Sequence, residues 1–94
     1  MSGGDVGAKA GKLVVMVGGD VEALEVVKPY MQYYSASIAH MGKAGFGQHT
    51  KMSNQIIIAG QMIGVVEGLM YGYKAGVPLP AMIELLSKGA ASSL

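Results

Sequence analysis

The feature that most constrains this chain is a long stretch without a strong helix breaker. From about residue 48 to residue 75 only glycines weaken helix formation, and Gly76-Val77-Pro78 ends the stretch. Such a helix is about 42 Å long at about 1.5 Å per residue, whereas a compact domain of this size has a radius of gyration of about 13 Å. The sequence therefore predicts a helix that extends beyond its own domain and needs neighbours. A second, shorter helix is predicted over residues 79–88.

Five glycines recur at every fourth position along this stretch and at its end: Gly60, Gly64, Gly68, Gly72 and Gly76. A glycine inside a helix costs about 1 kcal/mol relative to alanine, so close packing along this stripe must offset the cost. Residues 56–73 also raise the alternative of a membrane span with glycine-mediated contacts. Gln61 and Glu67 oppose that alternative, because an acid near the centre of a span costs about 2.5–3.5 kcal/mol. We therefore expect a buried helix in a soluble protein.

The first half of the chain predicts a β-α-β unit. Residues 2–11 are rich in glycine and small polar residues, which predicts a loop. Residues 13–17 are continuously apolar and mostly β-branched, as in a strand buried on both faces of a parallel sheet. Asp20 is placed to cap a helix over residues 20–33, and residues 35–41 alternate weakly, as a short strand does. We expect a right-handed crossover between the two strands, followed by a glycine-rich turn.

Composition excludes several classes of protein. Apolar residues make up 51% of the 94 residues and charged residues 14%, a balance that argues against disorder and leaves enough apolar surface to favour an oligomer or a fragment. The net charge of +1 without a basic stripe argues against nucleic-acid binding. Cysteine is absent, and His40 and His49 lack a second ligand at helical spacing, so no metal site is predicted. The first residues do not resemble a signal peptide, which favours the cytoplasm or a mitochondrial matrix.

Two glycine clusters invite comparison with dinucleotide-binding turns. Ser2-Gly3-Gly4-x-x-Gly7 precedes the first predicted strand, and Gly42-x-x-Gly45-x-Gly47 has the glycines of the fingerprint in the wrong order. Neither cluster follows a strand as G-x-G-x-x-G and opens a helix, which is the context that a dinucleotide turn requires. Spacing alone therefore indicates turns.

Lys51 is the candidate for chemistry, because it lies in the first turns of the long apolar helix. Asn54 and Gln55 follow at i+3 and i+4, on the same face. A lysine in apolar surroundings can exchange a proton with a substrate, and a nearby amide can orient a substrate hydroxyl. The simpler interpretation is that Lys51 extends to solvent near the helix end. The residues by themselves favour this second interpretation without excluding the first.

Three motifs in order nevertheless resemble the β-hydroxyacid dehydrogenases of the 3-hydroxyisobutyrate dehydrogenase and tartronate semialdehyde reductase kind. They are the segment from Ser2-Gly3-Gly4 to Gly18-Gly19, the segment Gly42-x-x-Gly45-x-Gly47-x-x-x-Lys51-x-x-Asn54-Gln55, and the segment from Val66-Glu67-Gly68-Leu69 to Lys74-Ala75-Gly76-Val77. The match runs in register from Ser2 to about Ser92. Three motifs in the right order at the right spacing make the resemblance specific.

The resemblance implies a role for each matching residue. Lys51 would be the general acid and base of a hydride transfer between NAD or NADP and a small β-hydroxy acid. Ser2, Gly3 and Gly4 would hold the substrate carboxylate. The substrate hydroxyl would bind either Asn54 or Gln55, because relatives differ in which position carries the amide. Gly45 and Gly47, in the turn near the nicotinamide, are weak candidates for cofactor contacts.

The resemblance also implies an α/β fold and a domain division. Residues 1–46 would be the C-terminal β-α-β part of a Rossmann-like domain, and residues 47–94 would begin an all-helical domain. The dinucleotide-gripping turn with which the family opens is absent, so we expect these 94 residues to be an inactive fragment by themselves. The long helix would mediate homo-oligomerisation. The alternative is a non-catalytic assembly module on the same fold, against which Lys51 argues, since non-catalytic relatives can lose that lysine. The sequence does not identify the particular hydroxy acid, and it does not distinguish NAD from NADP as the cofactor.

Overall fold

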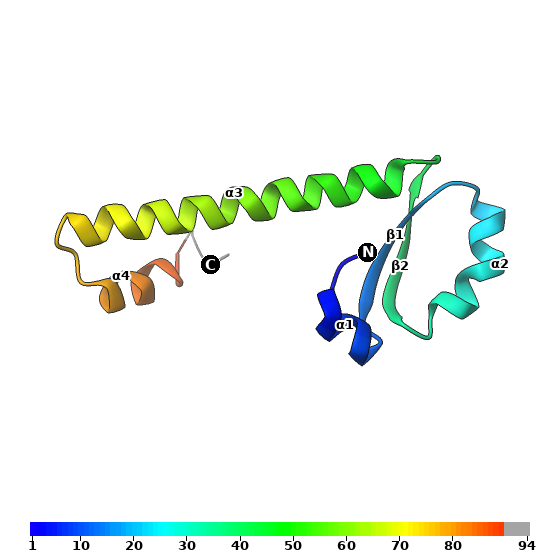
Figure 1. Ribbon diagram of the computed structural model, residues 1–94, viewed down its shortest axis with the longest axis horizontal. Helices are drawn as coiled ribbons and strands as arrows, with labels where there is room; N and C mark the ends of the chain where they lie inside the picture. Colours follow the sequence, from blue (N-terminus) through cyan, green and yellow to red (C-terminus); the bar gives the residue numbers. More distant parts are fainter. Residues whose placement is uncertain (90–94) are drawn as a thin grey trace. The chain divides into compact units, whose positions relative to one another are not determined.

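The computed structural model describes residues 1–89 of the chain, and the end of the predicted second domain, residues 90–94, lies outside the described residues. Four helices and two strands follow one another in these residues: α1 (Gly4–Ala10), β1 (Leu13–Gly18), α2 (Val21–Met31), β2 (Ser35–Gly42), α3 (Phe46–Lys74) and α4 (Leu79–Leu86) (Figure 1). They form two compact units, Met1–Asn54 and Gln55–Leu94, which we describe separately.

The first unit contains the predicted β-α-β arrangement. Strands β1 and β2 pair in parallel, with Leu13 opposite Ser35 and Val17 opposite His40, and α2 connects them beside the sheet (Figure 1). Parallel strands require such a crossover, because a tight turn can join only antiparallel neighbours. The α/β fold class is confirmed for this unit.

The core of the first unit lies on one face of the sheet. Leu13 and Val15 of β1 are buried together with Leu24 of α2, as expected when side chains alternate between the two faces of a strand. Val14, on the opposite face, is 42% exposed. The prediction that β1 is buried on both faces is therefore wrong for this chain alone, because the described residues leave Val14 on the second face exposed.

The predicted loop over residues 2–11 is wrong, since Gly4–Ala10 form the helix α1. The glycines that suggested a loop stand mainly at the ends of this helix. Gly3 precedes it at φ 131°, and Gly11 ends it in the left-handed conformation at φ 68°, with its N–H bonded to Ala8 O at 3.3 Å. Left-handed glycine is the usual helix terminator, because other residues pay a steric penalty there.

Helix α2 begins where its sequence predicts. The Asp20 side chain accepts a hydrogen bond from the Glu22 N–H at 2.9 Å, which satisfies one of the first N–H groups of the helix. The helix ends at Met31, two residues earlier than predicted. The buried Ser35 hydroxyl then donates to Met31 O at 2.5 Å and joins the end of α2 to the start of β2.

Helix α3 is the long predicted helix, and it runs from Phe46 to Lys74 without a break. Apolar residues occur all around it, and most are exposed, including Ile57 at 60% and Met62 at 64%. A helix that is apolar on all sides is normally enclosed by protein or lipid. Among the described residues α3 is the one helix long and apolar enough to cross a membrane, a criterion of length and composition that core helices of soluble proteins also meet.

The second unit pairs the end of α3 with α4. Gly76, at φ 90°, ends α3, and the Val77 N–H bonds to Gly72 O at 2.9 Å. Gly72 is buried, and a Cβ there would lie 2.5 Å from the Met82 sulfur, so this glycine allows α4 to pack closely. The two helices line an apolar groove of about 410 Å³, formed by Leu69, Met70, Tyr73, Lys74, Leu79 and Ile83.

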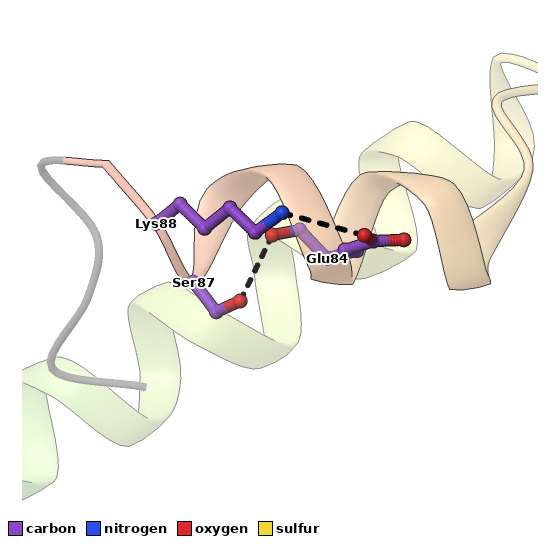
Figure 2. A network of polar contacts seen from close by, with 3 residues as sticks. All are labelled: Glu84, Ser87 and Lys88. Atoms are coloured by element: carbon purple, nitrogen blue, oxygen red, sulfur yellow. Dashed lines mark hydrogen bonds and ion pairs between the residues drawn. The ribbon is translucent and has the colours of Figure 1, made fainter.

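Helix α4 ends in a small polar network (Figure 2). The Ser87 hydroxyl donates to Glu84 O at 2.9 Å, and the Lys88 ammonium lies 3.4 Å from the Glu84 carboxylate. Both charged side chains are more than 70% exposed, so this ion pair contributes little to stability.

Candidate active site

The two ends of the first unit meet at one hydrogen bond. Lys51, in the second turn of α3, donates from Nζ to the Ser2 hydroxyl oxygen at 2.7 Å, and the bond is partly buried. These residues are 49 positions apart in the chain. The sequence predicted both as site residues, and the fold brings them into contact.

The backbone of Ser2 is held firmly against β1. Its N–H donates to Val14 O at 2.7 Å, and its carbonyl oxygen accepts from the Val14 N–H at 2.9 Å, which forms an isolated antiparallel bridge. The Ser2 hydroxyl accepts from Lys51 and still has its own proton to donate. A lysine and a serine in this arrangement offer donors to one anionic or carbonyl oxygen.

Gly3 and Gly4 continue directly from Ser2 into helix α1. Both have positive φ, 131° and 60°, a conformation that glycine adopts without strain. The first N–H groups of a helix have no intrahelical acceptor. Apart from the adjoining backbone, no atom of residues 1–89 lies within 4 Å of the position that a Cβ of Gly4 would occupy, so the approach to this backbone is open.

The two candidate amides lie one turn beyond Lys51. Asn54 is partly buried and belongs to the same compact unit as Lys51, whereas Gln55 is exposed and begins the second unit. Both residues already take part in an interaction within the chain. Its partial burial favours Asn54 as the amide beside Lys51.

The glycines of the turn before α3 differ in their surroundings. Gly45, at φ 91°, has open space where a Cβ would stand. Gly47 is buried, and a Cβ there would collide with the main-chain oxygen of Met16 in β1. Gly47 therefore has a packing reason to be glycine, which its position in the sequence did not disclose.

The histidines show no metal-ligand arrangement. His40 Nε2 lies 2.7 Å from Gly19 O, so this ring is hydrogen-bonded to the backbone. His49 packs edge-on against Phe46, with the ring centroids 6.2 Å apart. Within residues 1–89, no group of three or more metal-ligating side chains is found.

Two family models match the chain, one for each part. Residues 45–94, more than half of the chain, match the model described as NAD-binding of NADP-dependent 3-hydroxyisobutyrate dehydrogenase. Residues 1–42 match the NAD binding domain of 6-phosphogluconate dehydrogenase. The chain belongs to the β-hydroxyacid dehydrogenase family. The resemblance drawn from the three motifs is thereby confirmed.

Individual members of the family are similar over almost the whole chain. The chain is 46% identical over 93 residues to an uncharacterized oxidoreductase, YkwC, of Bacillus subtilis (strain 168), covering 99% of this chain and 32% of that protein. It is 44% identical over 93 residues to the Arabidopsis thaliana protein named "Probable 3-hydroxyisobutyrate dehydrogenase-like 1, mitochondrial", covering 99% of this chain and 28% of the relative. The chain thus spans about a third of the length of the curated relatives it matches.

A solved family structure has the same fold. The 3-hydroxyisobutyrate dehydrogenase of Mycobacterium tuberculosis, determined with L-serine, superimposes with a TM-score of 0.89 and 32% identity. The superposition covers 96% of this chain and 31% of that one. The predicted order, a parallel β-α-β unit followed by a long helix, is therefore that of the family.

Proposed function

We propose that the complete protein is an NAD(P)-dependent oxidoreductase that reversibly oxidises a small β-hydroxy acid. The observation that carries the proposal is the hydrogen bond of 2.7 Å between Lys51 and Ser2. It joins the candidate proton-transfer residue to the candidate carboxylate-binding segment in one compact unit. Membership of the family adds independent support.

In this proposal the substrate is bound at both ends. The Ser2 hydroxyl and the N–H groups of Gly3 and Gly4 receive the carboxylate, since an anion prefers such unsatisfied donors. Lys51 accepts the proton of the substrate hydroxyl during oxidation and returns it to the carbonyl oxygen during reduction. Asn54, with Gln55 as the second candidate, holds the same oxygen in position.

The substrate class is the one that the family resemblance implies. In a β-hydroxy acid, one other carbon separates the carbon of the carboxylate from the carbon that carries the reacting hydroxyl, as in 3-hydroxyisobutyrate, glycerate oxidised at its terminal carbon, and L-serine. L-serine accompanies the related mycobacterial structure, and 3-hydroxyisobutyrate appears in the name of the plant relative. We infer that the substituent on the middle carbon distinguishes the substrate within this class.

The cofactor would lie at the carboxyl end of the two parallel strands, where ligands of open α/β sheets bind. Gly19 follows β1 and Gly45 follows β2, and apart from the chain neighbours no atom in the described part of the chain lies within 4 Å of a Cβ built at either position. Such open glycines fit the close approach of a flat ring to the backbone. When bound, NAD or NADP accepts or supplies the hydride. Of the two glycines that the resemblance assigned to the cofactor, Gly45 is the better candidate, because Gly47 is packed against Met16.

The domain division and assembly are part of the proposal. Residues 1–46 would close the nucleotide-binding domain, and residues 47–94 would begin a helical domain that buries α3 against its remaining helices and a second subunit. The exposed apolar residues of α3, together with open space at Gly60, Gly64 and Gly68, support a protein neighbour for this helix. Glu67 within the helix favours protein over lipid as that neighbour. An aqueous compartment, the cytoplasm or a mitochondrial matrix, suits such an enzyme.

The test is turnover by the complete protein that contains this chain. We expect reduction of NAD or NADP with 3-hydroxyisobutyrate, L-serine or glycerate, followed by the absorbance of the reduced cofactor. A long-chain β-hydroxy acid serves as the size control. Absence of turnover with every acid and both cofactors would contradict the proposal and favour the non-catalytic assembly module.

A further inference from the structure

Helix α3 touches β1 through two glycines without any intervening side chain. A Cβ at Gly47 would collide with the Met16 main-chain oxygen and lie 3.0 Å from the Gly18 nitrogen. A Cβ at Gly18 would lie 2.6 Å from the Lys43 oxygen and 2.8 Å from the nitrogens of Gly47 and Phe46. At each glycine, the hydrogen atom that a side chain would replace thus points at the backbone of the other segment.

This contact cannot be relieved by moving a side chain. All the atoms in the way at Gly47 and Gly18 belong to the main chain. Neither glycine has positive φ, so the residue type is required by space and not by backbone conformation. A methyl group at either position would separate the helix from the strand by on the order of 1 Å, to reach an ordinary contact distance.

The same strand also holds the acceptor of the Lys51 hydrogen bond. Val14 binds Ser2 through two backbone hydrogen bonds. Along β1, Val14 is two residues, about 7 Å, from Met16. Lys51 is four residues, about 6 Å, from Gly47 along α3. Lys51 and the residue that anchors Ser2 therefore lie at similar distances from the Gly47–Met16 contact, one along α3 and the other along β1.

We propose that Gly47, with Gly18 opposite, is a positioning residue that sets the distance between Lys51 and the Ser2 segment. The inference rests on the proposed function and adds to it a residue that touches neither substrate nor reacting atoms. Methyl addition at residue 47 moves Lys51 while leaving its chemistry intact. Because a displacement of about 1 Å at reacting groups can cost about 100-fold in rate, we expect a loss in kcat of that order.

The experiment compares Gly47→Ala with the wild-type complete protein. We expect kcat to fall about 100-fold and the kinetic isotope effect with substrate deuterated at the reacting carbon to be larger than that of the wild type. Gly11→Ala is the matched control, since it adds the same methyl group and weakens the same unit at the end of α1, away from Lys51 and from the carboxyl ends of the strands. That control should keep both kcat and the isotope effect of the wild type.

A double variant separates positioning from general damage. In the Lys51→Ala background Gly47→Ala should cause little further loss, because it acts through the lysine. Loss that merely follows the folded fraction, with an unchanged isotope effect, would overturn the inference. If Gly47→Ala does not fold, Gly18→Ala is used, with the same expectations.

A crystal structure of the variant tests the inference independently of activity. We expect the Lys51–Ser2 distance to lengthen from 2.7 Å by on the order of 1 Å. An unchanged distance overturns the positioning role even if the enzyme is impaired. Conversely, if the wild type and Lys51→Ala are equally inactive, the proposed function is contradicted. The change in the Lys51–Ser2 distance can still be measured, because it does not depend on activity.

Discussion

Lys51 Nζ lies 2.7 Å from Ser2 Oγ, although the two residues are separated by most of the first unit of the chain. Ser2 is fixed to β1 by backbone bonds, and Lys51 is carried by α3, whose first turn rests on the same strand. The contact is therefore a product of two separate attachments to β1. It links the predicted substrate segment to the predicted proton-transfer residue.

Replacing Lys51 by alanine should reduce kcat of the complete protein by about 100-fold to 10,000-fold, since this is the usual contribution of a general acid or base. Binding of NAD or NADP, measured by fluorescence titration, should be unchanged. Lys12→Ala is the control, because Lys12 is an exposed lysine of the same unit. Equal activity of Lys51→Ala and wild type would remove lysine catalysis from the proposal.

Replacing Ser2 by alanine should raise KM for the hydroxy acid by about 10-fold to 150-fold, because one hydrogen bond to a charged group is worth about 1.5–3 kcal/mol. It also removes the acceptor of the Lys51 bond. The effects of Ser2→Ala and Lys51→Ala on kcat/KM should therefore be non-additive in a double-mutant cycle. Strict additivity would indicate that the observed contact has no part in catalysis.

Gly11 should tolerate asparagine better than alanine. Its φ of 68° ends helix α1, and asparagine adopts this left-handed conformation more readily than alanine does. We expect Gly11→Ala to lower the free energy of unfolding by about 1–2 kcal/mol and Gly11→Asn by less. Urea denaturation followed by circular dichroism measures both. An equal effect of the two substitutions would show that the backbone conformation is not what limits this position.

Removing the cap of α2 should weaken the first unit. Asp20→Ala should lower the free energy of unfolding by about 1 kcal/mol, while Asp20→Asn, which keeps the acceptor oxygen, should be nearly neutral. The measurement is the midpoint of urea unfolding at constant m-value. A large loss with asparagine would point to the charge of Asp20 and not to its hydrogen bond with Glu22.

Large side chains on the glycine stripe should disturb assembly. Gly64→Leu together with Gly68→Leu fills space that is open in the chain by itself, and we expect a change in oligomeric state by light scattering. Glu84→Gln, at the exposed end of α4, is the surface control. Unaltered assembly of the double variant would count against the stripe as a helix contact.

Local chemistry determined the elements that the sequence predicted correctly. Asp20 caps α2, the apolar run from Leu13 forms β1, and the breaker-free stretch forms α3. The sequence does not predict helix α1, because Gly3 and Gly11 are typical of a loop by composition, whereas in the structure they stand at the two ends of this helix. The sites of positive φ cannot be assigned to a cap or a loop from composition alone.

The sequence by itself determined the order of the elements from β1 to α4, the family motifs and the candidate residues Lys51 and Ser2, since each depends on neighbouring residues or on spacing along the chain. Only the tertiary structure decided that Ser2 pairs with Val14, that Lys51 reaches Ser2, and that Gly47 lies against Met16. These contacts join residues distant in sequence. Their distances are set by how strand and helix backbones pack, and no pattern along the chain specifies that packing.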